Sequence, residues 1–283
     1  MVMDYKFKSV YGEIEGAVLV IYLNRPQILN AWNLDLQEDL IKCVNQFDQD
    51  DSLKVAIVTG TGRAFCAGAD LSLGDFSSKE HVVGRGLAEA RDGGGQASLT
   101  IYRCRKPIIA AINGPAVGVG ITHTLPMDIR IAYKDAKVGF VFVRRGVVPE
   151  AVSTYFLPRL VGHSKAVRLM MMGQVLPASH PLYSDLFTEL TDTPEGALIR
   201  AKELAHEMAS MNSSVSMAMV KALLWHGTET PEEQHLLDSK GMFSLGNSID
   251  GKEGVASFMQ KRQVKFQGTV TKDMPVFYPV NMN

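Results

Sequence analysis

The chain has 283 residues, a formal net charge of −1 and three cysteines. This length can bury a sizeable core in one large domain or two, and a charge so close to zero offers no electrostatic surface for nucleic acid. No apolar run reaches the ~20 residues that span a bilayer, and the odd, unpatterned cysteines favour a reducing compartment over a disulfide framework.

Apolar runs and helical spacing alternate through the first half of the chain. Residues 17–23 and 55–59 are typical of short buried strands, and a helix is predicted between them with Asn33 as its N-cap. The apolar positions Leu36, Leu40, Ile41, Val44 and Phe47 would form the face of that helix that packs on a sheet. Two further runs, 107–112 and 129–132, have the character of buried strands. This alternation predicts an α/β fold with largely parallel pairing.

Residues 72–96 break the pattern. They contain Gly74, Gly84, Gly86 and a run of three glycines at 93–95, with charges of both signs and little periodicity. We expect a mobile segment with at most one short helix, at 82–90. The whole segment either covers a pocket as a lid or is disordered.

The last third of the chain has helical spacing at 196–208, 216–225 and 250–262, and an irregular tail beyond Phe266. We therefore expect a core domain at 1–193 and a helical C-terminal region at 194–283.

Two loops of small residues follow buried strands. Residues 63–70 (RAFCAGAD) follow the run at 55–59, and residues 113–120 (NGPAVGVG) follow the run at 107–112. Such loops can bring bare backbone N–H groups close to a substrate, and two N–H groups aimed at one point form an oxyanion hole. With the carboxylate of Glu150 opposite them as a proton shuttle, these loops predict enolate chemistry on a thioester.

Five motifs carry a family resemblance: residues 23–30 (LNRPQILN), 62–71 (GRAFCAGADL), 106–114 (KPIIAAING), 128–132 (DIRIA) and 253–262 (EGVASFMQKR). In this order and spacing the chain resembles the enoyl-CoA hydratase/isomerase family of the crotonase superfamily. The resemblance implies a ββα spiral core followed by a helical C-terminal region. It implies an acyl-CoA thioester as substrate, coenzyme A being part of that substrate, and no metal, redox cofactor, nucleic acid or membrane partner.

The resemblance also implies a homotrimer or homohexamer closed by the C-terminal helices. On the last of these, Val255, Phe258 and Met259 form a small apolar stripe that either meets a neighbouring subunit or folds back on its own.

Site residues carry over position by position. The resemblance places the two oxyanion-hole donors at the backbone N–H groups of Ala69 and Val119. Most relatives have glycine at the position of Val119, and a β-branched residue does not hold a positive φ comfortably. Substrate and CoA binding is expected at Gln27, Ile28, Leu29, Ala67, Ala69, Asp70, Leu71, Gly118, Phe142 and Lys261.

The carboxylates indicate which reaction is favoured. Hydratases of this family hold water between two glutamates, at positions that are Thr122 and Phe142 here. Glu150, in a Pro-Glu pair, instead resembles the single base of the isomerase branch. Its apolar neighbours predict a raised pKa. The alternative interpretation of Glu150 is a glutamate that stabilises the first turn of a helix, a role that can coexist with the catalytic one.

We therefore expect migration of a double bond from 3-enoyl-CoA to 2-enoyl-CoA. Hydration of a 2-enoyl-CoA and a catalytically idle scaffold remain as alternatives. A serine hydrolase would also need an oxyanion hole, but the turn at 118–122 has no serine and no G-x-S-x-G motif occurs. The N-terminus lacks an apolar signal and the C-terminus lacks a peroxisomal tripeptide, so the cytoplasm is the expected compartment.

Overall fold

A six-stranded sheet is the centre of the computed structural model, which describes residues 4–76, 82–84 and 86–278. The strand order is β1-β2-β3-β6-β8-β11, with β1 antiparallel to β2 and every later neighbouring pair parallel. The strands are β1 Val10–Glu15, β2 Val18–Leu23, β3 Val55–Gly60, β6 Ile108–Ile112, β8 Ile129–Tyr133 and β11 Glu189–Thr191. The predicted α/β fold with largely parallel pairing is therefore confirmed.

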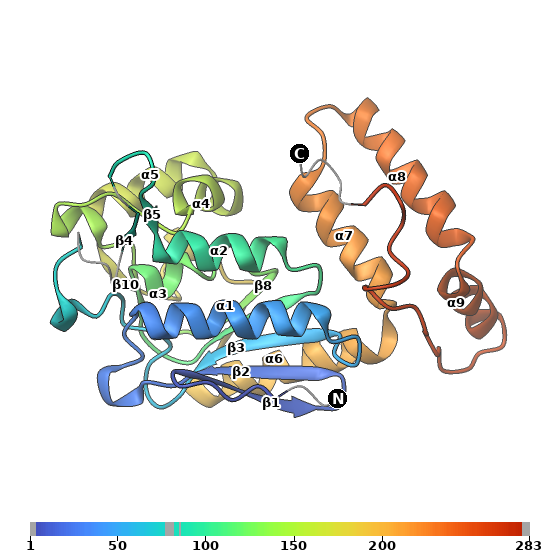
Figure 1. The fold of residues 1–283 in the computed structure, drawn as a ribbon, viewed down its shortest axis with the longest axis horizontal. Helices are drawn as coiled ribbons and strands as arrows, with labels where there is room; N and C mark the ends of the chain where they lie inside the picture. Colours follow the sequence, from blue (N-terminus) through green and yellow to red (C-terminus); the bar gives the residue numbers. More distant parts are fainter. Residues whose placement is uncertain (1–3, 77–81, 85, 279–283) are drawn as a thin grey trace.

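Helices cover both faces of this sheet (Figure 1). On one face, Leu19 and Ile21 of β2 pack in the cluster that includes helix α1 (Leu34–Gln49). On the other face, Val18 and Val20 pack with α6 (Pro194–Met211). Burial on both faces explains why these strands read as continuous apolar runs.

Helix α1 begins as predicted. The side-chain oxygen of Asn33 accepts the backbone N–H of Leu36 at 3.1 Å, which satisfies one orphan donor of the first turn. Four residues of the predicted stripe are fully buried and Ile41 is partly buried. The sequence spacing thus gave the inward face of α1 correctly.

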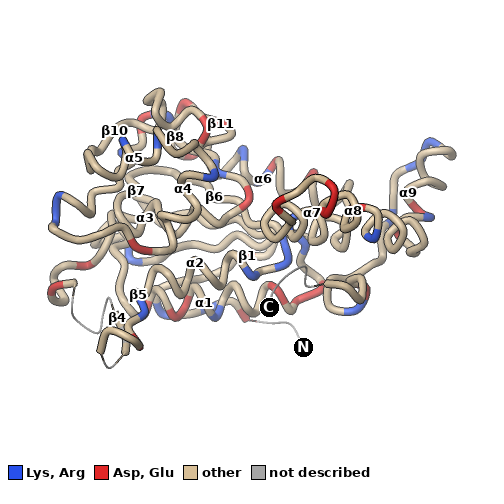
Figure 2. Tube along the Cα trace, turned by 90° about the horizontal axis from the view of Figure 1, so that it is seen from above, with Lys and Arg blue, Asp and Glu red and all other residues tan. Residues whose placement is uncertain are grey.

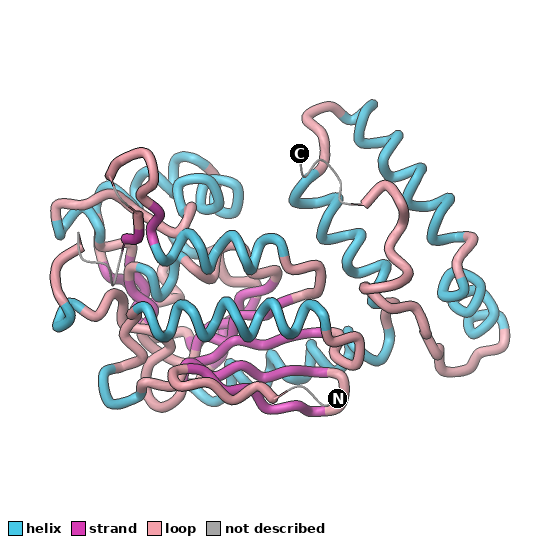
Figure 3. The backbone as a smooth tube through the Cα atoms, viewed as in Figure 1, coloured by secondary structure: helices cyan, strands magenta, loops and turns pink. Residues whose placement is uncertain are grey.

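Two smaller sheets lie toward one end of the main one, on the left of Figures 1 and 3. One has the order β10-β9-β7, and the other pairs β4 with β5. Their strands are β7 Ala116–Val117, β9 Lys137–Gly139, β10 Val175–Pro177, β4 Val82–Val83 and β5 Arg91–Asp92. Short 3-10 turns complete the connections: η1 Pro26–Ile28, η2 Leu71–Leu73, η3 Phe142–Arg145 and η4 Pro181–Tyr183.

The prediction for residues 72–96 was partly wrong. The segment was expected to hold at most one short helix at 82–90, and its described residues instead form the antiparallel pair β4–β5. The three glycines at 93–95 are buried in the first turn of helix α2 (Gly93–Arg103), because Asp92 caps that helix by accepting the N–H of Gly95. Residues 77–81 and 85 of this segment lie outside the described part of the chain.

The C-terminal helices separate into two groups. Helix α6 lies on the sheet through Ala197, Ala201 and Ala205, spaced four residues apart on one face. Helices α7, α8 and α9 extend away from the sheet (Figure 1). The remaining helices are α3 Val119–Thr122, α4 Ser153–Val161, α5 His163–Met172, α7 Ser214–His226, α8 Pro231–Gly246 and α9 Ile249–Met259. The region expected to begin at 194 thus opens with a helix that packs on the core sheet.

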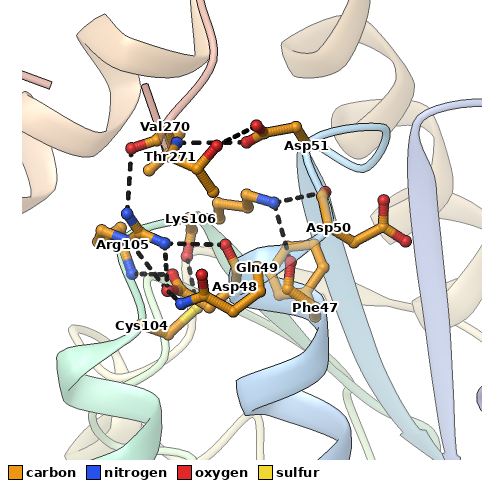
Figure 4. A network of polar contacts seen from close by, with 10 residues as sticks. All are labelled: Phe47, Asp48, Gln49, Asp50, Asp51, Cys104, Arg105, Lys106, Val270 and Thr271. Carbon is orange, nitrogen blue, oxygen red and sulfur yellow. Dashed lines mark hydrogen bonds and ion pairs between the residues drawn. The ribbon is translucent and has the colours of Figure 1, made fainter. Parts of the chain in front are cut away.

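A buried lysine closes the C-terminal end of α1 (Figure 4). Nζ of Lys106 donates to the carbonyl oxygens of Phe47 at 2.8 Å and Asp50 at 2.6 Å. Each carbonyl also accepts a backbone N–H, from Asp50 to Phe47 at 3.2 Å and from Leu53 to Asp50 at 2.9 Å. The ammonium group therefore gives each carbonyl a second, charged donor at the end of α1.

The same network holds the tail of the chain. Arg105 forms an ion pair with Asp48 at 2.7 Å and donates to the carbonyl of Val270 at 3.0 Å. The hydroxyl of Thr271 donates to Asp51 (Figure 4). The predicted irregular tail therefore follows a defined path, although it contains no helix or strand within the residues described up to 278.

Replacing Lys106 with methionine is expected to lower the free energy of unfolding by about 2–3 kcal/mol. The substitution keeps the aliphatic stem and leaves each carbonyl its backbone donor, but it removes two hydrogen bonds from a charged group, each of which contributes ~1.5–3 kcal/mol, and it also removes the cost of burying the ammonium. Chemical denaturation measures the change. The exposed Lys42, which forms a surface ion pair with Glu38, provides the control: Lys42→Met is expected to change stability by less than about 0.5 kcal/mol. Equal effects of the two substitutions would contradict this role of Lys106.

Charged residues of both signs are interspersed over the chain rather than gathered on one face (Figure 2). Among the helices that the structure describes, none is long and apolar enough to cross a membrane.

Candidate active site

A mostly apolar pocket of about 370 Å³ lies between the segments that follow β3 and β6 and the segment around η3. It brings together seven of the residues expected at the site: Ala67, Ala69, Leu71, Gly118, Val119, Phe142 and Glu150. Its wall also contains Trp32, Phe76, Val147 and Val148. Such a surface suits an extended hydrocarbon chain better than a polar ligand.

Ala69 lies in a segment whose hydrogen bonds fix the direction of its N–H. Residues on either side pair with Trp32: its N–H donates to Gly68 at 2.8 Å, and its carbonyl accepts from Asp70 at 2.8 Å. In this parallel bridge between Trp32 and Ala69, the N–H of Ala69 points away from Trp32. Ala69 lines the pocket, and the bridge leaves its N–H unused, as an oxyanion-hole donor requires.

Val119 opens the short helix α3, so its N–H has no intrahelical partner. The concern that valine cannot hold a positive φ does not apply here. The positive φ falls on Gly118, at 56°, and Val119 is absent from the residues with positive φ in the described part of the chain. Glycine thus makes the turn, and Val119, which lines the pocket, keeps a backbone N–H that no helical bond uses.

Glu150 is held by an unusual backbone. It stands three residues before α4, and the two residues that follow it, Ala151 and Val152, have φ values of 59° and 56°. Left-handed backbone at a β-branched residue costs about 1–3 kcal/mol. The alternative interpretation of Glu150, as a glutamate in the first turn of a helix, was wrong because α4 begins only at Ser153.

The carboxylate of Glu150 lies beside polar partners at one end of the apolar pocket. The hydroxyl of Thr122 donates to its Oε1 at 2.7 Å. Burial raises the pKa of Glu150 well above its usual range, the Thr122 hydrogen bond opposes that rise, and the nearby negative charge of Asp92 adds to it. The raised pKa agrees in direction with the prediction from the apolar neighbours.

The two positions of the hydratase glutamates take different parts in this geometry. Phe142 is buried in the pocket wall, so it contributes an apolar surface there. Thr122 is fully buried and supplies a hydroxyl to Glu150 instead of a carboxylate of its own.

Sequence reasoning missed Asp92. This residue lines the pocket and lies within hydrogen-bonding reach of Glu150. An aspartate immediately before a helix is an N-cap signal. The three glycines that follow it concealed the signal, because glycine is a poor helix former.

Other expected binding residues lie outside the pocket wall. Gln27 and Ile28 are exposed in η1, and the carbonyl of Leu29 accepts the N–H of Ala67 at 3.0 Å, which joins that turn to the first loop. Lys261 is exposed just beyond α9, and α9 lies far from α3 and β5, whose residues line the pocket (Figure 1).

Asp70, expected among the binding residues, is not part of the pocket wall and instead organises the first loop. It forms an ion pair with Arg25 at 3.0 Å and accepts the hydroxyl of Ser72 at 2.6 Å. Burial opposes its ionisation, but the hydrogen bonds from Ser72 and Arg25 outweigh burial and lower its pKa. The carboxylate therefore stays charged and holds the turn beside Ala69.

His123 supports the second loop as a neutral side chain. Its Nδ1 donates to the carbonyl of Val119 at 2.6 Å, and its ring stacks on Phe65 with centroids 5.6 Å apart. Burial lowers its pKa to about 4, so the ring stays uncharged near neutral pH. Packing, rather than proton transfer, explains this histidine.

Comparison with known proteins agrees with the fold. The family model for enoyl-CoA hydratase/isomerase matches residues 13–269. The enoyl-CoA hydratase AFT3-1 of Alternaria alternata is 42% identical over 261 residues, covering 92% of this chain and 86% of the relative. The 1,2-epoxyphenylacetyl-CoA isomerase of Escherichia coli K12 is 30% identical, covering 92% and 98%. The crystal structure of enoyl-CoA hydratase from Mycobacterium tuberculosis H37Rv superposes with a TM-score of 0.81 at 31% identity, covering 92% and 99%. The expected crotonase-type core is therefore confirmed, and the chain belongs to the enoyl-CoA hydratase/isomerase family.

Proposed function

We propose that this protein moves the double bond of a 3-enoyl-CoA thioester to give the 2-enoyl-CoA. The observation that carries the proposal is the buried Glu150, held by Thr122 at 2.7 Å in a largely apolar pocket. A single carboxylate of raised pKa can take up a proton and return it. The apolar wall, with Phe142 where a hydratase has a glutamate, favours a hydrocarbon chain over a bound water.

The proposed mechanism conserves all atoms of the substrate. Ionised Glu150 removes a proton from C2, and the electrons of that C–H bond form a dienolate whose negative charge lies on the thioester oxygen. The N–H groups of Ala69 and Val119 stabilise this oxygen. Glu150 then returns the proton to C4, and the double bond ends between C2 and C3.

Hydration of a 2-enoyl-CoA is the second candidate, and one observation favours it. Asp92 gives the pocket a second carboxylate beside Glu150, and two carboxylates can activate a water. Relatives named enoyl-CoA hydratase add to this candidate.

A panel of 3-enoyl and 2-enoyl thioesters of graded chain length tests both candidates. Mass spectrometry and chromatography identify the products. We expect 3-enoyl substrates to isomerise without change of mass, whereas 2-enoyl substrates that gain the mass of one water would support the hydratase. Release of free CoA would indicate a hydrolase, and no reaction with any thioester would leave the idle scaffold.

We further propose a trimer or hexamer in which α9 of one chain reaches the CoA site of another. Val255, Phe258 and Met259 are 67%, 82% and 73% exposed within the single chain, so the stripe does not fold back on its own subunit. Closed cyclic symmetry would let each stripe meet a different patch of the next chain. Such an assembly would also place Lys261 near the pocket of a neighbouring chain.

Light scattering at micromolar concentration is expected to give a mass of three or six chains. Removing residues 250–283 is expected to lower the mass and to weaken CoA binding. Phe258→Asp in the full chain tests the stripe without truncation, because a charge buried in an apolar contact is strongly unfavourable. Lys240→Asp on the exposed surface of α8 is the control. A fully active monomer would contradict the proposed assembly.

A further inference from the structure

We propose that Asp92 and Glu150 act as a pair that shares one proton, with Asp92 as the positioning residue that accepts a hydrogen bond from Glu150 when Glu150 carries the substrate proton. This inference rests on the proposed function, because it assigns the chain a means of stabilising the protonated form of its base. It concerns a residue to which the resemblance gives no role.

Asp92 is fixed by two backbone donors from different parts of the chain. Its Oδ1 accepts the N–H of Gly95 at 2.5 Å and the N–H of Ala151 at 3.0 Å. The first bond caps α2, and the second reaches the residue directly after Glu150. Asp92 therefore joins the start of α2 to the strained turn that presents Glu150. Both bonds end on Oδ1, which leaves Oδ2 as the oxygen that can accept from Glu150.

The glycine run beside Asp92 makes room for this pair. A Cβ at Gly94 would lie 1.8 Å from Oε2 of Glu150, and a Cβ at Gly95 would lie 2.6 Å from Oδ2 of Asp92. Any side chain at position 94 would thus displace the glutamate. Three glycines in the first turn of a helix lower its intrinsic helix propensity. The close approach of Glu150 to the helix explains why position 94 is glycine.

The other groups around Glu150 leave Asp92 as its main charged neighbour. Cys66, on the loop after β3, is kept neutral by burial, which raises its pKa to about 12. His123, one residue after Thr122, is neutral as described above. Arg145 lines the same pocket from η3 but is an exposed side chain, where solvent screens its charge.

Asp92 and Thr122 act on opposite protonation states of Glu150. The hydroxyl of Thr122 donates a hydrogen bond to Glu150, which favours the carboxylate. The negative charge of Asp92 favours the protonated acid. Removing each partner should therefore move the titration of Glu150 in opposite directions, a result that simple damage to the fold would not produce.

The first experiment needs no substrate. Infrared spectra of the protonated carboxyl group are recorded across a pH series, and subtraction of Glu150→Gln spectra isolates the Glu150 signal. In Asp92→Asn the titration midpoint is expected to fall by about one pH unit or more, and in Thr122→Val it is expected to rise. Asp92→Ser serves as a second variant, since serine retains N-cap capacity while removing the charge. Glu38→Gln, an exposed change of equal charge on α1, should leave the midpoint unchanged.

The second experiment measures kcat and KM against pH with the best substrate of the panel. Because Glu150 must be ionised to accept a proton, the rate rises with pH through its pKa. Asp92→Asn is expected to move this rise to lower pH and to reduce the limiting kcat by about tenfold or more, because a weaker base transfers protons less readily. KM should stay within about twofold.

A midpoint in Asp92→Asn and Asp92→Ser that stays fixed or moves upward would overturn the pair, even if isomerisation is observed. An infrared shift in a protein that turns over no 3-enoyl thioester would instead keep the pair and remove the proposed reaction. A change in KM alone would also contradict a role for Asp92 in proton transfer.

Discussion

Replacing Glu150 with glutamine is expected to reduce isomerase turnover by ~10²–10⁴-fold, the usual contribution of a general base. Glutamine preserves the size of the side chain and can still meet the Thr122 hydroxyl, which lies 2.7 Å from Oε1 of Glu150. Binding of a substrate analogue should therefore stay near the native value. Product chromatography gives kcat, and calorimetry gives the dissociation constant.

Thr122→Ala is the matched control for this variant, because it removes a hydrogen bond to Glu150 but leaves the base in place. Its loss of turnover is expected to be far smaller. A loss below about tenfold in Glu150→Gln would exclude Glu150 as the base, and a large loss in Thr122→Ala would favour a hydration-like mechanism.

Glu150→Gln should also make the folded protein more stable at pH values above the acidic range. The pKa of Glu150 is about 4.3 in an unfolded chain and higher in the folded protein. Between these two values the folded state binds more protons than the unfolded state, so stability falls as pH rises through this window. Glutamine cannot ionise, and its stabilising effect should grow with pH and vanish near pH 4. Thermal unfolding across pH measures this, and a stability loss at pH 8 would contradict it.

The parts of the fold that the sequence predicted are those in which local chemistry and tertiary packing agree. The strands β2, β3, β6 and β8 are buried on both faces, so burial alone produced the apolar runs that revealed them. Helix α1 carries both a spaced apolar face and the N-cap Asn33. The two loops of small residues could also be predicted from the sequence, because the turn at Gly118 has a positive φ, which favours glycine.

Other features depend on contacts between distant segments. Asp92 and Glu150 are separated by nearly sixty residues and come together only because Asp92 accepts the N–H of Ala151. The glycines at 93–95 suggested mobility, yet Gly94 is small because a carboxylate packs against it. In the sequence, a glycine run caused by mobility looks the same as one required by close packing. The predicted mobility of residues 93–95 was therefore wrong because the site packs closely against them.

A further test removes the expected oxyanion-hole donors one at a time. Ala69→Pro deletes one N–H and is expected to reduce turnover by ~10²–10³-fold, as the loss of a single oxyanion donor does elsewhere. The flanking hydrogen bonds between Trp32 and residues 68 and 70 do not use the N–H of Ala69. The substitution therefore leaves the bonds that shape the loop in place while it removes the N–H proposed to bind the thioester oxygen.

Val119→Pro removes the other donor at the first position of α3, where proline is tolerated in helices, and should cause a loss of similar size. Ala69→Ser and Val119→Gly keep both N–H groups and are the controls, with expected losses of less than about tenfold. Thermal unfolding establishes that each variant is folded. Normal turnover in either folded proline variant would mean that the thioester oxygen binds elsewhere. A loss confined to the proline variants, with their controls active, would identify the backbone N–H groups, and not the side chains at 69 and 119, as the groups that stabilise the dienolate.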